Sequence, residues 1–136
     1  MNTSEVVYLG ELSTEAIHIK SSSKISTDAP IDNNGLGRTF SPTDLLATSL
    51  ASCMLTIMGI RAQDSGWDIS GSKAFVKKVM ASNPRRVSEI KVQFEVMDRN
   101  LTDAQKTILE KAALSCPVAL SLSESLKQEV SFSYRK

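Results

Sequence analysis

The stretch that decides the fold is residues 41–64, which read SPTDLLATSLASCMLTIMGIRAQD. Its start carries three helix signals. Ser41 suits the N-cap, Pro42 suits the first helical position, and the carboxylate of Asp44 faces the positive end of the helix dipole. Gly66 follows the segment and is typical of a position just beyond a helix C-terminus. We therefore predict one long helix from residue 42 to about residue 64.

Apolar residues cover most of the circumference of this predicted helix. They are Leu45, Leu46, Ala47, Leu50, Ala51, Cys53, Met54, Leu55, Ile57, Met58 and Ile60. A helix that is apolar on nearly all sides is a buried one. The small residues Thr48, Ser52, Thr56 and Gly59 form the remaining stripe, which permits close packing against a second element. A chain of 136 residues does not easily cover such a helix alone, so we expect an intimate oligomer.

The segments before and after the helix indicate an α+β protein. Residues 90–97 alternate apolar and polar side chains, which predicts a strand with one buried face. Thr102 and Gln105 form a capping box at the start of a second helix. We expect one domain over residues 1–136, with helices packed against an antiparallel sheet. The predicted elements are a hairpin over 6–20, a loop over 21–37 with a short strand near 24–26, strands over 67–80 and 90–97, helices over 102–115 and 116–126, and a strand over 130–134.

Composition narrows the functional classes. The formal net charge of +1 gives no reason to expect a nucleic-acid partner. Residues 1–10 lack the pattern of a signal peptide, and no stretch reaches the roughly 18 apolar residues that span a bilayer. We therefore expect a cytoplasmic protein with no membrane partner. One His and two Cys provide no ligand set at metal-binding spacing, so we expect neither a metal nor a cofactor.

The two cysteines are either buried thiols or a transient redox pair, because structural disulfides are rare in the cytosol. Cys116 precedes Pro117 and should cap a helix, whose amides and dipole would lower the pKa of its thiol. The alternative is a small residue that closes a helix corner. Cys53 lies mid-helix, where packing is the default role and burial alone would leave the thiol protonated and inert. Reactivity at Cys53 would therefore need a nearby cation.

Arg38 is the candidate for this cation. It lies in Asn34-Gly35-Leu36-Gly37-Arg38, a glycine-flanked loop just before the long helix. A guanidinium group stays charged and donates a fork of hydrogen bonds, which suits it to stabilise a thiolate. The alternative for Arg38 is a solvated loop residue.

Two motifs resemble those of the OsmC/Ohr family. Residues 41–53 resemble the Pro-started helix that carries the first cysteine of these proteins. Ser115-Cys116-Pro117-Val118 resembles their second-cysteine motif. The order of elements agrees over nearly the whole chain. The resemblance implies an OsmC-like fold, in which an antiparallel sheet packs on a long buried central helix within an intertwined homodimer.

The resemblance also implies a reaction without a cofactor. It is the thiol-dependent reduction of organic hydroperoxides, and often of hydrogen peroxide, in oxidative stress defence. Cys53 would attack the peroxide and become a sulfenic acid, and Cys116 would condense with it into a disulfide. An external dithiol of the lipoyl or thioredoxin type would then reduce the disulfide. The alternative is an OsmC-like binding module for a small apolar ligand, with the cysteines lining its pocket.

The sequence departs from the family pattern at one position. In peroxidase members a glutamate follows the helix-starting proline and holds the activating arginine. Here that position is Thr43, and Asp44 follows it, about 100° further round the helix. We expect Arg38 to be the activating arginine and Asp44 to be its holder. The Gly37-Arg38 pair resembles the OsmC-like branch more than the Ohr branch.

Overall fold

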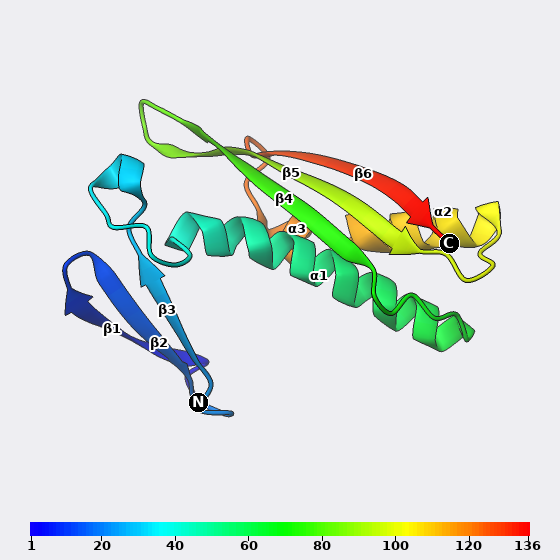
Figure 1. The fold of residues 1–136 in the computed structure, drawn as a ribbon, viewed down its shortest axis with the longest axis horizontal. Coiled ribbons are helices and arrows are strands. Elements are labelled where there is room, and N and C mark those ends of the chain that lie inside the picture. The colour runs from blue at the N-terminus through cyan, green and yellow to red at the C-terminus, as the bar shows by residue number, and fades with distance from the viewer. The chain divides into compact units, whose positions relative to one another are not determined.

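A computed structural model describes residues 1–136 and divides the chain into two compact units, residues 1–46 and 47–136. The first unit contains an antiparallel sheet in the order β1-β2-β3, followed by a short 3-10 turn (Figure 1). The predicted hairpin and the short strand after it are confirmed, whereas the single domain over residues 1–136 stays a prediction. The elements are β1 (Ser4–Gly10), β2 (Ser13–His18), β3 (Lys24–Asp28) and η1 (Ile31–Asn33).

Helix α1 (Pro42–Ser65) confirms the helix predicted from its start and stop signals. The backbone N–H of Asp44 donates to Ser41 Oγ at 3.0 Å, and the backbone N–H of Ser41 donates to Asp44 Oδ2 at 3.0 Å. This reciprocal pair satisfies donors at the helix start that have no partner within the helix. Gly66 follows the helix with φ +78°, a conformation that favours glycine.

Within one chain, α1 is buried on one face rather than on all sides. The buried residues are Ala47, Leu50, Ala51, Met54, Met58 and Ala62. Ser52, Thr56 and Ile60 are exposed, and Ile60 is 51% accessible. One sheet covers only one side of the helix, so burial of the other sides stays a prediction that needs an oligomer.

Helix α1 is also long and apolar enough to cross a membrane when only length and composition are considered. Its best 18-residue window has a mean hydropathy of 1.6. The expectation that no stretch is long and apolar enough to span a bilayer is wrong. The Thr, Ser and Gly residues of the stripe on α1 lower its mean hydropathy only slightly. Core helices of soluble proteins have the same length and composition, and one face of α1 packs into the hydrophobic core.

The second unit is built on a three-stranded sheet with β5 in the centre (Figure 1). Its strands are β4 (Lys73–Ala81), β5 (Arg86–Met97) and β6 (Lys127–Arg135). The alternation predicted for residues 90–97 is confirmed, since the apolar side chains of β5 belong to one core with α1 and α2 (Asp103–Leu114). Within this core Phe94 stacks on Phe132 with ring centroids 5.1 Å apart.

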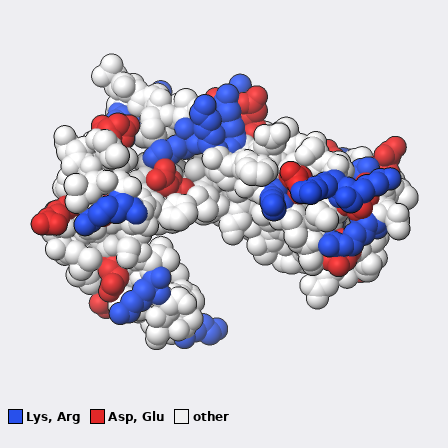
Figure 2. Space-filling view, in the orientation of Figure 1, with Lys and Arg blue, Asp and Glu red and all other residues white.

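Strand β6 runs parallel to β5, whereas β4 is antiparallel to it. The sheet is therefore mixed, and the prediction of a purely antiparallel sheet is wrong. The segment between β5 and β6 contains two helices, long enough to return the chain to the starting end of the sheet. Figure 2 shows basic side chains beside acidic ones on the face drawn. Three ion pairs join the strands: Glu89–Lys127 (3.5 Å), Lys91–Glu129 (3.6 Å) and Glu95–Arg135 (3.1 Å).

Two predicted boundaries differ from the structure. The strand predicted over residues 67–80 begins only at Lys73, because the carboxylate of Asp68 accepts the backbone N–H of Ser70 at 2.8 Å and turns the chain. The helix predicted over residues 116–126 is the short α3 (Pro117–Ser121), since Leu122 is extended. The capping box predicted at the start of α2 is confirmed.

Candidate functional site

Cys116 lies at the junction of α2 and α3 and caps α3, as its place before Pro117 predicts. Its Sγ accepts the backbone N–H of Ala119 at 3.3 Å. Its backbone N–H donates to the carbonyl of Ala113 at 3.3 Å, which fixes the residue to the end of α2. The side chain is fully buried, so the surrounding core holds the thiol in one place.

Burial raises the pKa of the Cys116 thiol, and this effect exceeds the opposing effect of the Ala119 amide. Contact with Cys53 raises the pKa of Cys116 further, because a negative charge at Cys53 disfavours a second one beside it. The cap acts on the pKa of Cys116 in the expected direction, but the net pKa is raised, so the expectation of a lowered pKa is wrong. The cap is present, but desolvation of the thiol outweighs it.

Cys53 lies in the middle of α1, is half-buried and packs against the hydrophobic core. Its thiol and that of Cys116 are both free, and the two side chains are in hydrogen-bonding contact. Two cysteines far apart in the sequence thus meet within the second unit. Cys53 is the more accessible of the two, and Cys116 is fully buried.

Arg38 lies in the first unit and is held by Asp28, at the end of β3. Its Nε donates to Asp28 Oδ2 at 2.8 Å, and its Nη2 donates to Oδ1 at 3.1 Å. The expectation that Asp44 holds Arg38 is wrong. The carboxylate of Asp44 accepts the backbone N–H of Ser41 and caps the start of α1.

Sequence reasoning missed Asp28 as the partner of Arg38. The two residues are ten positions apart and are separated by a loop that includes Gly35 and Gly37. No periodic pattern connects a strand end to a residue beyond such a loop. The signal that was present is an acidic residue two positions after the strand predicted near 24–26, followed by a turn-forming Ala29-Pro30 pair.

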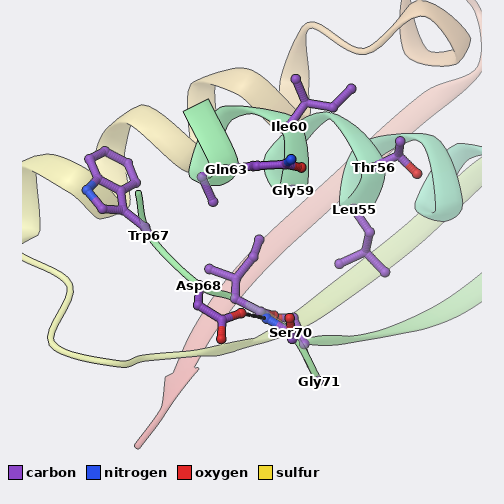
Figure 3. A pocket seen from close by; sticks show the side chains of 12 residues that line it. Leu55, Thr56, Gly59, Ile60, Gln63, Trp67, Asp68, Ser70 and Gly71 are labelled. Carbon is purple, nitrogen blue, oxygen red and sulfur yellow. Dashed lines mark hydrogen bonds between the residues drawn. The ribbon is translucent and has the colours of Figure 1, made fainter. Parts of the chain in front are cut away.

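A cavity of about 700 Å³ lies elsewhere in the second unit, between the C-terminal half of α1 and residues 67–72 (Figure 3). Leu55, Thr56 and Gly59 line it from the helix, and Trp67 lines it from the loop. Neither cysteine lines this cavity. Its size alone is no reason to place the chemistry there, and the thiol pair remains the reactive feature of the unit.

The arrangement of the thiols permits a two-electron cycle. An oxidant reaches the half-buried Cys53 more readily than the fully buried Cys116. A sulfenic acid formed at Cys53 would already be in contact with the Cys116 sulfur, so disulfide formation would need only small adjustments. Forming a disulfide in this way requires neither a metal nor an organic cofactor.

Comparisons with known proteins agree with the fold and with the motifs. A sequence model of the OsmC-like protein family matches residues 35–131. No curated protein matches the sequence. A crystal structure from Psychrobacter arcticus 273-4, of a protein with a suggested role in the osmotic stress and detoxification response, is 53% identical. It covers 98% of this chain and 96% of that chain, with a TM-score of 0.93.

Two solved structures with lower identity share the fold. One is the organic hydroperoxide resistance protein OsmC from Legionella pneumophila, at 16% identity, with 98% of each chain covered and a TM-score of 0.72. The other is an organic hydroperoxide resistance protein from Elizabethkingia anophelis, at 12% identity, with 99% of this chain and 98% of that chain covered and a TM-score of 0.75. These likenesses confirm the predicted fold class.

Proposed function

The chain belongs to the OsmC-like protein family, and from this membership we propose that it is a cysteine-based peroxidase that reduces organic hydroperoxides. Two structural relatives are named organic hydroperoxide resistance proteins, which supports this substrate class. The relative with 53% identity has a suggested role in detoxification, which fits the same chemistry. We place the enzyme in the cytoplasm, where a thiol pair is kept reduced between turnovers.

The proposed cycle balances with a hydroperoxide and a dithiol. The Cys53 thiolate attacks the terminal peroxide oxygen, an S–O bond forms, the O–O bond breaks, and the alcohol leaves after taking a proton. The Cys116 sulfur then attacks the Cys53 sulfenic acid. The S–S bond forms, the S–O bond breaks and water leaves. An external dithiol of the lipoyl or thioredoxin type reduces the disulfide and becomes oxidised itself.

The observation that carries the proposal is the contact between two thiols of unequal burial. Its test is a thiol titration of the reduced protein before and after one equivalent of cumene hydroperoxide. We expect both thiols to disappear and cumyl alcohol to form. Intact mass should show the loss of two hydrogens, as one intramolecular disulfide requires.

Other outcomes of this titration separate the rival functions. Unchanged thiols would favour a binding module for a small apolar ligand, in which the cysteines only line the pocket. Loss of one thiol with the gain of one oxygen would show oxidation at Cys53 without resolution by Cys116. Disulfides between chains would contradict a cycle that is completed within one chain.

The proposal includes a homodimer, because both units expose apolar side chains that a partner could cover. In the first unit, Val6, Tyr8 and Leu9 of β1 are 62%, 64% and 60% accessible. In the second unit, the exposed face of α1 carries Ile60. A monomer would leave these side chains in water at a cost of about 25 cal/mol per Å² of apolar surface.

Replacing Gly59 with Trp should disrupt this dimer. A Cβ at Gly59 meets nothing within 4 Å in the single chain, so the monomer has room for a larger side chain. A second copy packed on this face of α1 would collide with the indole. Light scattering at micromolar concentration should show a dimer for the wild type and mostly monomer for Gly59→Trp.

The matched control is Lys111→Trp, which places the same side chain on an exposed position of α2. This variant should remain a dimer. A wild-type protein that is monomeric at micromolar concentration would contradict the dimer itself. A Gly59→Trp protein that stays fully dimeric would instead exclude this face of α1 from the interface.

A further inference from the structure

Gln128 of β6 makes a side-chain hydrogen bond to α3, the short helix that begins after Cys116. Its Nε2 donates to the carbonyl oxygen of Ala119 at 3.0 Å, and the Gln128 side chain is half-buried. The chain leaves α3, turns and begins β6 at Lys127 (Figure 1). This bond therefore fastens the middle of α3 to the first residues of β6.

Helix α3 is too short to provide a backbone donor for this carbonyl. In a longer α-helix the carbonyl of Ala119 would accept the N–H of the residue four positions later. Here α3 ends at Ser121, and Leu122 is extended. Ala119 is buried, so leaving its carbonyl without a partner would cost free energy. The side-chain amide of Gln128 takes the place of the missing backbone donor.

The other backbone group of Ala119 is bonded to the thiol. Its N–H donates to Cys116 Sγ at 3.3 Å, and the N–H of Leu120 donates to the carbonyl of Cys116 at 3.1 Å. Burial raises the pKa of the Cys116 thiol, and the amides of Ala119 and next Val118 oppose this rise. An amide stabilises a thiolate only when it is aimed at the sulfur, because hydrogen bonds weaken steeply as their angle closes.

The sheet gives Gln128 a firm support. In the parallel register of β5 and β6, Gln128 lies opposite the fully buried Ile90. On the other side, the backbone N–H of Cys116 donates to the carbonyl of Ala113 at the end of α2. Cys116 is therefore tied to α2 directly, and to the sheet through Ala119 and Gln128.

We propose that Gln128 is a positioning residue for the second step of the peroxidase cycle. Through Ala119 it holds the backbone N–H that stabilises the Cys116 sulfur as this sulfur attacks the Cys53 sulfenic acid. In that step the S–S bond forms, the S–O bond breaks and water leaves. The inference rests on the proposed function and deepens it. The first step does not use the Cys116 sulfur, so it should not depend on Gln128.

The test replaces Gln128 with Met, which has a similar length and no N–H donor. The reduced protein is mixed with one equivalent of cumene hydroperoxide and quenched with acid at successive times. Cumyl alcohol measures the first step, and intact mass measures the conversion of sulfenic acid into disulfide. Gln128→Met should form cumyl alcohol at the wild-type rate. It should form the disulfide about tenfold more slowly, the effect of weakening one hydrogen bond to a charged group.

The pH dependence separates positioning from a purely structural role. A poorly aimed Ala119 amide should leave the pKa of Cys116 higher than in the wild type, so less thiolate is present at neutral pH. Much of the lost rate of disulfide formation should return as the pH rises. Titration of the Cys116 thiolate by its ultraviolet absorbance, in a Cys53→Ser background, should show the same direction of change without any peroxide.

Two further variants control for shape and for stability. Gln128→Glu keeps the shape of the side chain and replaces the donor with a carboxylate oxygen, so it should slow the second step at least as much as Gln128→Met. It also carries the test if Gln128→Met does not fold. The matched control is Ser133→Ala, because Ser133 Oγ on the same strand donates to the carbonyl of Phe94 at 3.0 Å. This variant should leave both steps and the Cys116 titration unchanged.

The outcomes distinguish this inference from the proposed function. Disulfide formation at the wild-type rate in Gln128→Met or Gln128→Glu would overturn the positioning role and leave the peroxidase standing. An equal slowing of both steps, or the same loss in Ser133→Ala, would show general damage and would also overturn it. If the wild type forms no cumyl alcohol, the peroxidase proposal fails. The Cys116 titration then decides the positioning role alone, and an unchanged pKa in Gln128→Met would overturn it.

Discussion

Cys53→Ser should abolish peroxide consumption. A serine hydroxyl is not ionised at neutral pH and does not accept the peroxide oxygen, so the first step of the cycle is lost. Removing the nucleophile of an enzyme leaves only binding and electrostatic effects, and we expect a loss on the order of 10³-fold or more. Consumption of cumene hydroperoxide with an excess of dithiol is the measurement. The half-buried position of Cys53 makes serine a conservative change, so the fold should be retained.

Cys116→Ser is the matched variant for the second cysteine of the pair. It should still allow one oxidation of Cys53, and the sulfenic acid should persist because no resolving sulfur is in contact with it. Dimedone should therefore trap one adduct per chain, at Cys53. Labelling of Cys116 in the Cys53→Ser protein, with none at Cys53 in the Cys116→Ser protein, would reverse the two assignments.

Much of the fold could be predicted because it depends on local signals. The start of α1 follows from Ser41, Pro42 and Asp44, and the buried face of β5 follows from strict alternation. The predictions that were wrong depend on long-range pairing. The parallel direction of β6 is accompanied by ion pairs with β5, and no local pattern reveals which strand will lie beside it. The early start predicted for β4 ignored the turn at Asp68.

The two cysteines of the candidate site could be predicted from the sequence, whereas the direction of the Cys116 pKa and the partner of Arg38 could not. The place of Cys116 before Pro117 predicted its cap, but the direction of its pKa depends on a burial that the local sequence does not encode. Arg38 was chosen because a glycine loop precedes α1, and its role beside Cys53 stays a prediction. Its holder was assigned to Asp44, the nearest acid in the sequence. The partner in space is Asp28, since the loop folds back on the strand that precedes it.

Gly35→Ala should disrupt the loop that brings Arg38 to Asp28. A Cβ at Gly35 would lie 1.7 Å from the carbonyl oxygen of Ala29 and 2.2 Å from its carbonyl carbon, so the backbone must move. We expect a loss of about 3 kcal/mol in the free energy of unfolding, the upper end of the usual cost of an overpacked site. Thermal unfolding at fixed protein concentration measures this loss.

The Gly66→Ala variant is the control for Gly35→Ala. It measures the loss of unfolding free energy from a methyl group added to a glycine where no collision occurs. Gly66 has φ +78°, but a Cβ there meets nothing within 4 Å, so the cost is conformational and about 1–2 kcal/mol. This variant should lower the unfolding temperature less than Gly35→Ala does. Equal losses for the two variants would show that the loop yields to the added methyl group.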